Sequence, residues 1–187
     1  MKKKVIALIF IFLFTLGGVS ARAGLLIDLT YTGYTEETSN GKTRHTQKQA
    51  YLGGVGVDVF ETFWVGLFYT GMDHTVTGKD KYQVTLTDLG PFVRWQWNEG
   101  GALSFAAGYG LLSKASIIDD TSKEEWEGTA YWGQVAFTPE VFRGFHLGVA
   151  GTYYSAYYTT RKIESTEKSA SYTINWFLPT VTALITF

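Results

Sequence analysis

Alternation of apolar and polar residues along residues 24–187 constrains the fold of this chain more than any other feature. A period of two is typical of β-strands with one apolar face, because successive side chains of a strand point to opposite sides of the sheet. In one stretch, Leu103, Phe105 and Ala107 alternate with Ser104 and Ala106. Eight such segments are expected as strands, at 24–34, 48–60, 63–72, 82–97, 102–113, 126–138, 145–158 and 169–187.

The connections between the expected strands alternate in length. Four polar segments, at 35–47, 73–81, 114–125 and 159–168, alternate with short turns at 61–62, 98–101 and 139–144. Transmembrane barrels show this asymmetry, with short turns in the periplasm and longer loops outside the cell. The pattern therefore predicts an all-β fold, a closed antiparallel transmembrane β-barrel of about eight strands with meander (up-and-down) topology.

A soluble, lipocalin-like barrel would show the same alternation of apolar and polar residues. The soluble and the membrane barrel are distinguished by the face of each strand that carries fewer large apolar residues, here called the poorer face. In a membrane barrel the large apolar residues point out into lipid and the inward set is small or polar. A dry core would not accept an unpaired set of charges and amides. The poorer face carries such a set, namely Asp28, Asp58, Asp88, Arg94, Gln96, Gln134 and His146.

Residues 1–23 are expected to be a cleaved signal peptide. Three lysines precede an apolar stretch from Val5 to Val19, and small residues lead to a cleavage site between Ala23 and Gly24. An uncleaved anchor is the alternative, but 15 apolar residues ending in Gly17 and Gly18 suit a signal better than a spanning helix. Residues 24–187 then form one domain, exported to the bacterial outer membrane.

Composition excludes several classes of function. Cleavage removes four of 16 basic residues and none of 17 acidic ones, so 12 remain against 17 and the net charge is −5. A nucleic-acid partner is not expected from this balance. There is no cysteine, so disulfides do not stabilise the exported domain. No cofactor motif or metal-ligand spacing is found, and Asp119-Asp120 lacks the periodic acids of a calcium loop.

Polar residues on the inward face are expected to gather toward the periplasmic end of the lumen. Odd strands climb from that end and even strands return to it, which brings together Asp28, Asp58, Arg94, Gln96 and His146. An eight-stranded barrel is only just wide enough for side chains to fill. We therefore predict a plug in which Arg94 pairs with Asp58 or with Asp28; separate residues in water-filled space are the alternative.

Aromatic residues near strand ends are expected to form girdles at the two membrane interfaces. The expected members are Tyr31, Tyr34, Tyr51, Tyr69, Trp95, Trp97, Tyr131, Phe137, Tyr157 and Tyr158. A second, bulky apolar set is placed inside the barrel, where it would either fill the lumen or line a route for apolar molecules: Trp64, Phe68, Met72, Phe92, Trp132 and Leu178.

The last strand carries the one motif-like feature of the chain. Phe177, Val181, Ile185 and Phe187 lie on one face, and the chain closes on an aromatic residue. Here the sequence resembles the eight-stranded outer-membrane barrels of the OmpA, OmpX and OmpW type, and 176–187 is loosely similar to the OmpW branch. The resemblance implies that Ile185 and Phe187 are recognised by the barrel assembly machinery, and that outer-membrane lipid surrounds the barrel.

Enzymes occur among such barrels, where lipid A palmitoyltransferases and deacylases use a histidine with a serine near the outer surface. His45 and His74 fall in outer segments without a His-x-Ser pattern, and His146 lies at the opposite end. We therefore expect no enzyme. The expected function is a structural or interaction protein with a filled lumen that displays four extracellular loops to an unknown partner. A small passive channel or an OmpW-like lateral route is the alternative, and a lipid-modifying enzyme comes last.

Overall fold

The computed structural model describes residues 24–39, 43–60, 62–78, 81–97, 102–119, 122–163 and 166–187. The expected signal peptide, 1–23, and Ala23 of its cleavage site lie outside the described residues. Among the described residues, no helix has the length and apolar character to cross a bilayer. The strands are β1 (Leu25–Ser39), β2 (Thr43–Phe60), β3 (Phe63–Thr77), β4 (Tyr82–Gln96), β5 (Leu103–Asp119), β6 (Lys123–Phe137), β7 (Glu140–Phe142), β8 (Phe145–Ile163) and β9 (Thr166–Thr186).

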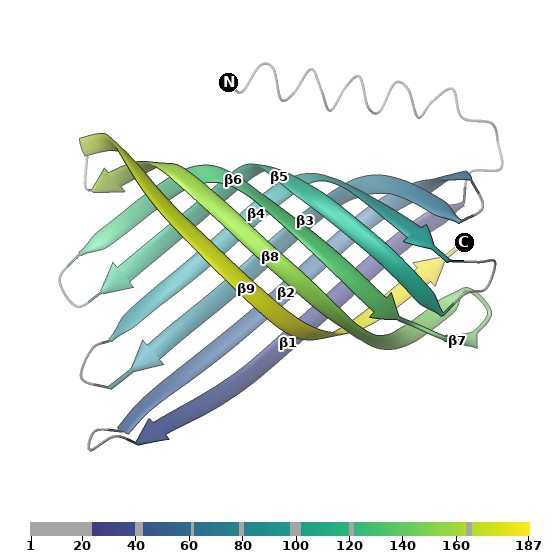
Figure 1. The fold of residues 1–187 in the computed structure, drawn as a ribbon, viewed down its shortest axis with the longest axis horizontal. Helices are drawn as coiled ribbons and strands as arrows, with labels where there is room; N and C mark the ends of the chain where they lie inside the picture. Colours follow the sequence, from purple (N-terminus) through teal and green to yellow (C-terminus); the bar gives the residue numbers. More distant parts are fainter. Residues whose placement is uncertain are drawn as a thin grey trace.

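Eight of these strands close into a ring. Each strand from β1 to β6 pairs antiparallel with the next, β6 pairs with β8, β8 with β9, and β9 returns to β1. The strands cross the barrel diagonally in Figure 1, with β7 and the C-terminus at the same end. The prediction of a closed, eight-stranded antiparallel meander is therefore confirmed. The additional strand, β7, occupies the expected turn at 139–144 and pairs only with the start of β8.

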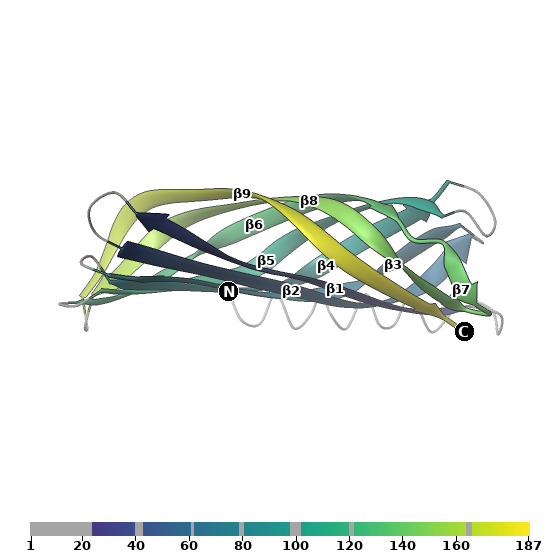
Figure 2. The same cartoon turned by 90° about the horizontal axis from the view of Figure 1, so that it is seen from below.

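The seam between the first and last strands closes the barrel at one end. Its register runs from Leu26↔Thr186 to Tyr31↔Val181. The backbones of Leu25 and Phe187 exchange hydrogen bonds of 3.0 and 3.3 Å. Beyond Tyr31, β1 stays paired with β2 and β9 with β8, and β1 and β9 diverge in both Figure 1 and Figure 2. The seam is thus the shortest paired boundary in the ring.

The prediction of four long loops in the polar segments is wrong. The strands continue through those segments, and the hairpins stay paired out to Ser39↔Thr43, Val76↔Tyr82, Ile118↔Lys123 and Ile163↔Thr166. Polar composition misled the prediction because these residues leave the apolar zone of the barrel while their backbones remain paired. The barrel therefore presents long β-hairpins at this end, which we call the hairpin end.

Outward-facing side chains form an apolar zone, hereafter the belt, between two aromatic girdles. Toward the hairpin end lies a tyrosine girdle of Tyr31, Tyr51, Tyr69, Tyr109, Tyr131 and Tyr153, with 44% to 53% of each residue exposed. The other end carries Phe60, Trp95, Trp97, Phe137, Phe142 and Phe187. Between the girdles, Leu29, Val55, Val135, Val149 and Val181 are each more than half exposed. Large apolar side chains thus face away from the barrel around the ring.

The girdle prediction fails at two positions, and at the first of them Tyr158 is fully buried inside the barrel. Tyr157 carries the outward position instead, with 48% of the residue exposed. Alternation along β8 explains the error, because Tyr158 shares the inward face with Thr152, Tyr154 and Ala156. The second position is Tyr34, which shares the even-numbered inward face of β1 with Asp28 and Thr30, and the centroid of its ring lies 5.5 Å from Lys48 Nζ.

The lumen is filled by side chains. All six bulky residues placed inward from the sequence are buried, each with 5% or less of the residue exposed: Trp64, Phe68, Met72, Phe92, Trp132 and Leu178. Phe68 meets Trp132 edge-on at 5.4 Å between ring centroids. Phe92 lies against Trp132 at 6.4 Å. These rings fit because the inward positions facing them, including Gly54, Gly66 and Gly108, carry no side chain.

Replacing Gly108 with alanine is expected to destabilise the barrel by about 1–3 kcal/mol through overpacking. A Cβ at Gly108 would lie 2.4 Å from Trp132 Nε1 and 2.8 Å from Phe68. The matched control is Gly133→Ala on β6, where a Cβ would meet nothing within 4 Å. Denaturant titration of both variants in detergent micelles measures the difference in stability. Equal unfolding midpoints would show that the rings of Phe68 and Trp132 shift to accept the added methyl group at no measurable cost.

Candidate functional site

The most strongly connected polar group in the barrel surrounds Arg94. Its side chain and that of Asp28 are both fully buried, and Arg94 reaches from β4 across the lumen to β1. Arg94 Nη2 donates to Asp28 Oδ2 at 2.5 Å and Nε donates to the same oxygen at 3.1 Å. Nη1 donates to Ser104 Oγ at 2.8 Å, and Nη2 also donates to Gln134 Oε1 at 2.7 Å. Both charges are thereby paired inside a low-dielectric space.

Threonines extend this network around the wall. The Gln134 amide donates to Thr152 Oγ1 at 3.0 Å and to Thr30 Oγ1 at 3.4 Å. Thr30 and Thr182 hydroxyls lie 3.0 Å apart, and those of Thr152 and Thr180 lie 3.4 Å apart. We call Asp28, Thr30, Arg94, Ser104, Gln134 and Thr152 the plug. Together with the two threonines of β9, it ties six of the eight ring strands to one another.

The rest of the cross-section at this level is apolar. The inward positions of β2 and β3 are Gly54, Gly56 and Gly66, and the Phe92 ring lies over all three. On the hairpin side of the plug, Phe68, Phe92 and Trp132 add an aromatic layer. A polar layer and an apolar layer therefore both obstruct the lumen.

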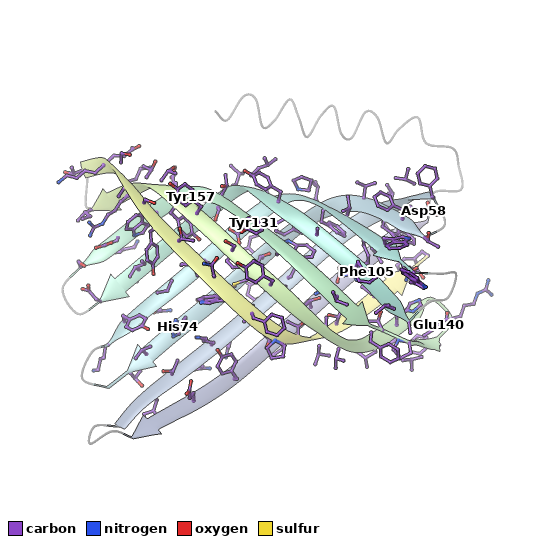
Figure 3. All side chains as sticks on the ribbon, in the orientation of Figure 1. Asp58, His74, Phe105, Tyr131, Glu140 and Tyr157 are labelled. Atoms are coloured by element: carbon purple, nitrogen blue, oxygen red, sulfur yellow. The ribbon has the colours of Figure 1, made fainter. Side chains whose placement is uncertain are left out.

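The structure does not gather the five predicted cluster residues into one site. Arg94 lies against Asp28 rather than Asp58, while Asp58 is half-buried and accepts a hydrogen bond from the Gly24 backbone N–H at 2.8 Å. Figure 3 shows Asp58 at the end of the barrel that also carries Phe105 and Glu140. Gln96 is buried opposite Ser104 in the β4–β5 register. His146 is buried near β7, where Nδ1 lies 3.3 Å from the Thr138 carbonyl oxygen.

A second buried polar cluster, around Asp88, was missed by the sequence reasoning. Tyr154 donates its hydroxyl hydrogen to Asp88 Oδ2 at 2.8 Å, and Ser113 donates to the Tyr158 hydroxyl at 3.4 Å. Asp88 Oδ1 has no hydrogen-bond partner among the described residues. The sequence places Asp88, Tyr154 and Tyr158 on inward faces, but it does not show which strands face each other across the lumen.

Between the two polar clusters lies a cavity of about 20 Å³, room for roughly one water molecule. Thr70 and Trp132 line it, and Thr70 Oγ1 and Trp132 Nε1 are buried without a partner among the described residues. Met72, Leu178 and Tyr154 form other parts of its wall. The cavity is too small for a solute larger than water.

Asp28→Asn and Asp88→Asn are expected to have different effects on the free energy of unfolding. Asp28 neutralises a buried guanidinium, so Asp28→Asn leaves Arg94 uncompensated and lowers the free energy of unfolding by several kcal/mol, on the order of 3–5. Within the described part of the chain no cation forms an ion pair with Asp88, and asparagine keeps an oxygen for Tyr154. Asp88→Asn should therefore leave stability unchanged or raise it by about 1 kcal/mol. Equal losses in denaturant titrations of the two variants would contradict this assignment.

Ion pairs lie at the hairpin end, outside the belt. Arg161 on β8 donates to Glu124 on β6 through Nε at 2.9 Å and through Nη2, and its guanidinium lies 5.5 Å from the centroid of the Trp126 ring. Lys162 Nζ lies 3.1 Å from Glu127. These hydrogen bonds raise the pKa of Arg161 and of Lys162. Cross-strand pairs thus join the hairpin extensions of β6 and β8.

Within the described ranges, no group of three His, Cys, Asp or Glu side chains could hold a metal ion. His74 packs edge-on against Tyr82 and Trp176, at 5.4 and 6.0 Å between ring centroids. Figure 3 shows His74 toward the hairpin end. The absence of enzymatic activity stays a prediction.

Comparison with known proteins finds likeness in solved structures. No family model matches the chain, and no curated protein matches it. The translocator domain of the autotransporter NalP from Neisseria meningitidis is 15% identical with a TM-score of 0.46, covering 91% of this chain and 64% of that one. Neisserial surface protein A is 12% identical with a TM-score of 0.47, covering 88% and 97%. The transport unit of the autotransporter AIDA-I from Escherichia coli is 13% identical with a TM-score of 0.35, covering 92% and 77%.

This chain therefore spans about two thirds of the length of the NalP translocator domain. A likeness at this level assigns no role to any residue here. The resemblance to the OmpA, OmpX and OmpW type stays a prediction.

Proposed function

We propose that this chain is an integral protein of the bacterial outer membrane, a sealed barrel that displays β-hairpins outside the cell. The observation that carries the proposal is the belt. Water-soluble proteins rarely expose contiguous apolar patches larger than a few hundred Å². Here large apolar side chains face outward all around the ring, and an aromatic girdle borders them toward each end of the barrel. Lipid-facing barrels have this arrangement.

The plug supports a structural or interaction role over conduction. Arg94 and its partners occupy the lumen at one level, and three aromatic rings occupy the next. A solute crossing this barrel would have to break a buried ion pair and move bulky side chains. The hairpins are then the surface available to an extracellular partner, whose identity is unknown. During biogenesis, the barrel assembly machinery would recognise Ile185 and Phe187.

One observation favours the second candidate, a lateral route for apolar molecules. The seam between β1 and β9 is paired only as far as Tyr31↔Val181. A route through the wall would start where this pairing ends, because no hydrogen bonds would have to break there. The cavity inside the wall holds about one water, so such a route would also require side chains to move.

The proposal predicts which end of the barrel faces the medium. The chain has no cysteine, so a single introduced thiol is an unambiguous reporter. Lys168→Cys places the thiol on the exposed end of β9, and Val141→Cys places it on exposed β7 at the opposite end. A bulky polyethylene-glycol maleimide added to intact cells should label Lys168→Cys and should label Val141→Cys only after the outer membrane is permeabilised. Equal labelling of both before permeabilisation would contradict the proposed location.

A further inference from the structure

The outer wall of the barrel contains a groove within the belt. It spans β9, β1 and β2, has a volume of about 560 Å³, and is lined by Leu29, Thr30, Tyr31, Tyr51, Leu52, Gly53, Val181 and Ala183. Thr30 and Leu52 bury their side chains in the lumen, so the groove is lined by apolar and aromatic groups and by backbone. Its volume lies within the range of small-molecule pockets, about 300–1,000 Å³.

Gly53 creates the depth of this groove. Its neighbours Tyr51 and Val55 on the same face project outward, with 46% and 55% of each residue exposed. A Cβ built at Gly53 would meet nothing within 4 Å, so there is open space at this point of the wall. Ala183 of β9, paired with Leu29, is the other small outward side chain along the groove.

We propose that this groove binds one acyl chain of a membrane lipid as a specific site. This inference rests on the proposed function, because the groove is continuous with the belt that faces lipid. Lipid is the medium that meets this surface, and a polar ligand would find almost no polar side chain in the groove to bind. The tyrosine girdle gives the site a direction, since Tyr31 and Tyr51 lie at the hairpin end of the groove. Their hydroxyls suit the polar linkage of a lipid whose chain runs toward Gly53.

The end of the seam supplies the second argument. Pairing between β1 and β9 stops at Tyr31↔Val181, and both residues line the groove. Just beyond them, Gly33 of β1 and Pro179 of β9 are the next residues whose backbone groups point into the seam, because the hydrogen-bonded positions alternate from Leu25 and Phe187, and no pairing joins Gly33 to Pro179. Unpaired backbone polar groups are costly next to hydrocarbon. The ester or amide linkage of a bound lipid can accept hydrogen bonds there, so a lipid fits this seam better than it fits the fully paired boundaries elsewhere.

The test fills the groove with a side chain. Wild type and Gly53→Phe are reconstituted into dimyristoylphosphatidylcholine nanodiscs, released into mild detergent, and examined by native mass spectrometry. Wild type should retain one phospholipid, and Gly53→Phe should lower the retained fraction about tenfold, because the phenyl ring occupies the space of the chain. The matched control is Gly133→Phe, on the outward face of β6, where a Cβ also meets nothing within 4 Å.

Two results overturn the inference: no retained phospholipid on wild type, or equal retention by Gly53→Phe and Gly133→Phe. Both would leave the outer-membrane proposal standing, provided that the proteins enter nanodiscs as folded barrels. Failure of the wild type itself to insert, with a soluble folded barrel remaining, would instead refute the proposed function.

Discussion

Arg94→Ala is expected to lower the free energy of unfolding by about 3–5 kcal/mol. The substitution removes the cation that neutralises Asp28, and Asp28 is fully buried. It also leaves Ser104 Oγ and Gln134 Oε1 without their donor. A buried carboxylate without a cation, left with one hydrogen bond of 3.4 Å from the Thr30 hydroxyl, carries most of the penalty, because little water can reach it. Denaturant titration in micelles measures the loss.

A double-mutant cycle separates the ion pair from general packing. Asp28→Ala combined with Arg94→Ala removes both charges, so the double variant should be much more stable than the sum of the two single losses predicts. Additive losses would show that the charges do not interact strongly. A loss below about 1 kcal/mol for Arg94→Ala alone, the size expected of exposed ion pairs, would contradict the plug as a buried structural unit.

Val55→Arg is expected to destabilise the folded barrel in a bilayer by about 2–4 kcal/mol. Val55 lies on the outward face of β2 with 55% of the residue exposed, midway between Tyr51 and Val59. In lipid the guanidinium must lie in hydrocarbon or distort the bilayer to reach water. In a water-soluble barrel the same exposed change would stay within about 0.5 kcal/mol. The size of the loss in stability therefore shows whether lipid or water surrounds the outer wall of the barrel.

Gln47→Arg is the matched control for Val55→Arg. Gln47 is exposed on the same strand and outside the belt, so an arginine there should change the stability by no more than about 0.5 kcal/mol. Reversible unfolding of both variants from phospholipid vesicles gives the comparison. Indistinguishable stabilities would mean that the belt does not face hydrocarbon.

Much of the fold follows from the period-two pattern, because alternation fixes which side chains share a face. Leu29 and Val55 lie outside, while Phe68 and Trp132 lie inside. The ring closes as expected, since an open sheet edge with this outward face would leave unsatisfied backbone in hydrocarbon. Strand ends were predicted less well. Polar segments such as 35–47 were expected as loops, but the hairpin ladder extends through them.

The plug could be anticipated only in part. Arg94 is the cation on the inward face that the sequence placed near Asp28 and Asp58, but the choice between them depends on tilt and register, which alternation does not fix. Asp28 lies across the lumen from Arg94, whereas Asp58 turns to the backbone of Gly24. Bulges also intervene, as between Gly110 and Ser113 on β5, where the inward face changes from even to odd numbers. The Asp88 cluster lies at that bulge, so the alternation of apolar and polar residues does not predict it.

Single-channel conductance in a planar bilayer tests the sealed barrel most directly. Wild type, inserted as a folded barrel, should produce no steady current, because the plug and the aromatic layer obstruct the lumen. Arg94→Ala removes the side chain that spans the lumen, so it should show current steps or increased noise if the barrel remains folded. A steady conductance from the wild type would contradict the account and make a passive channel the better description.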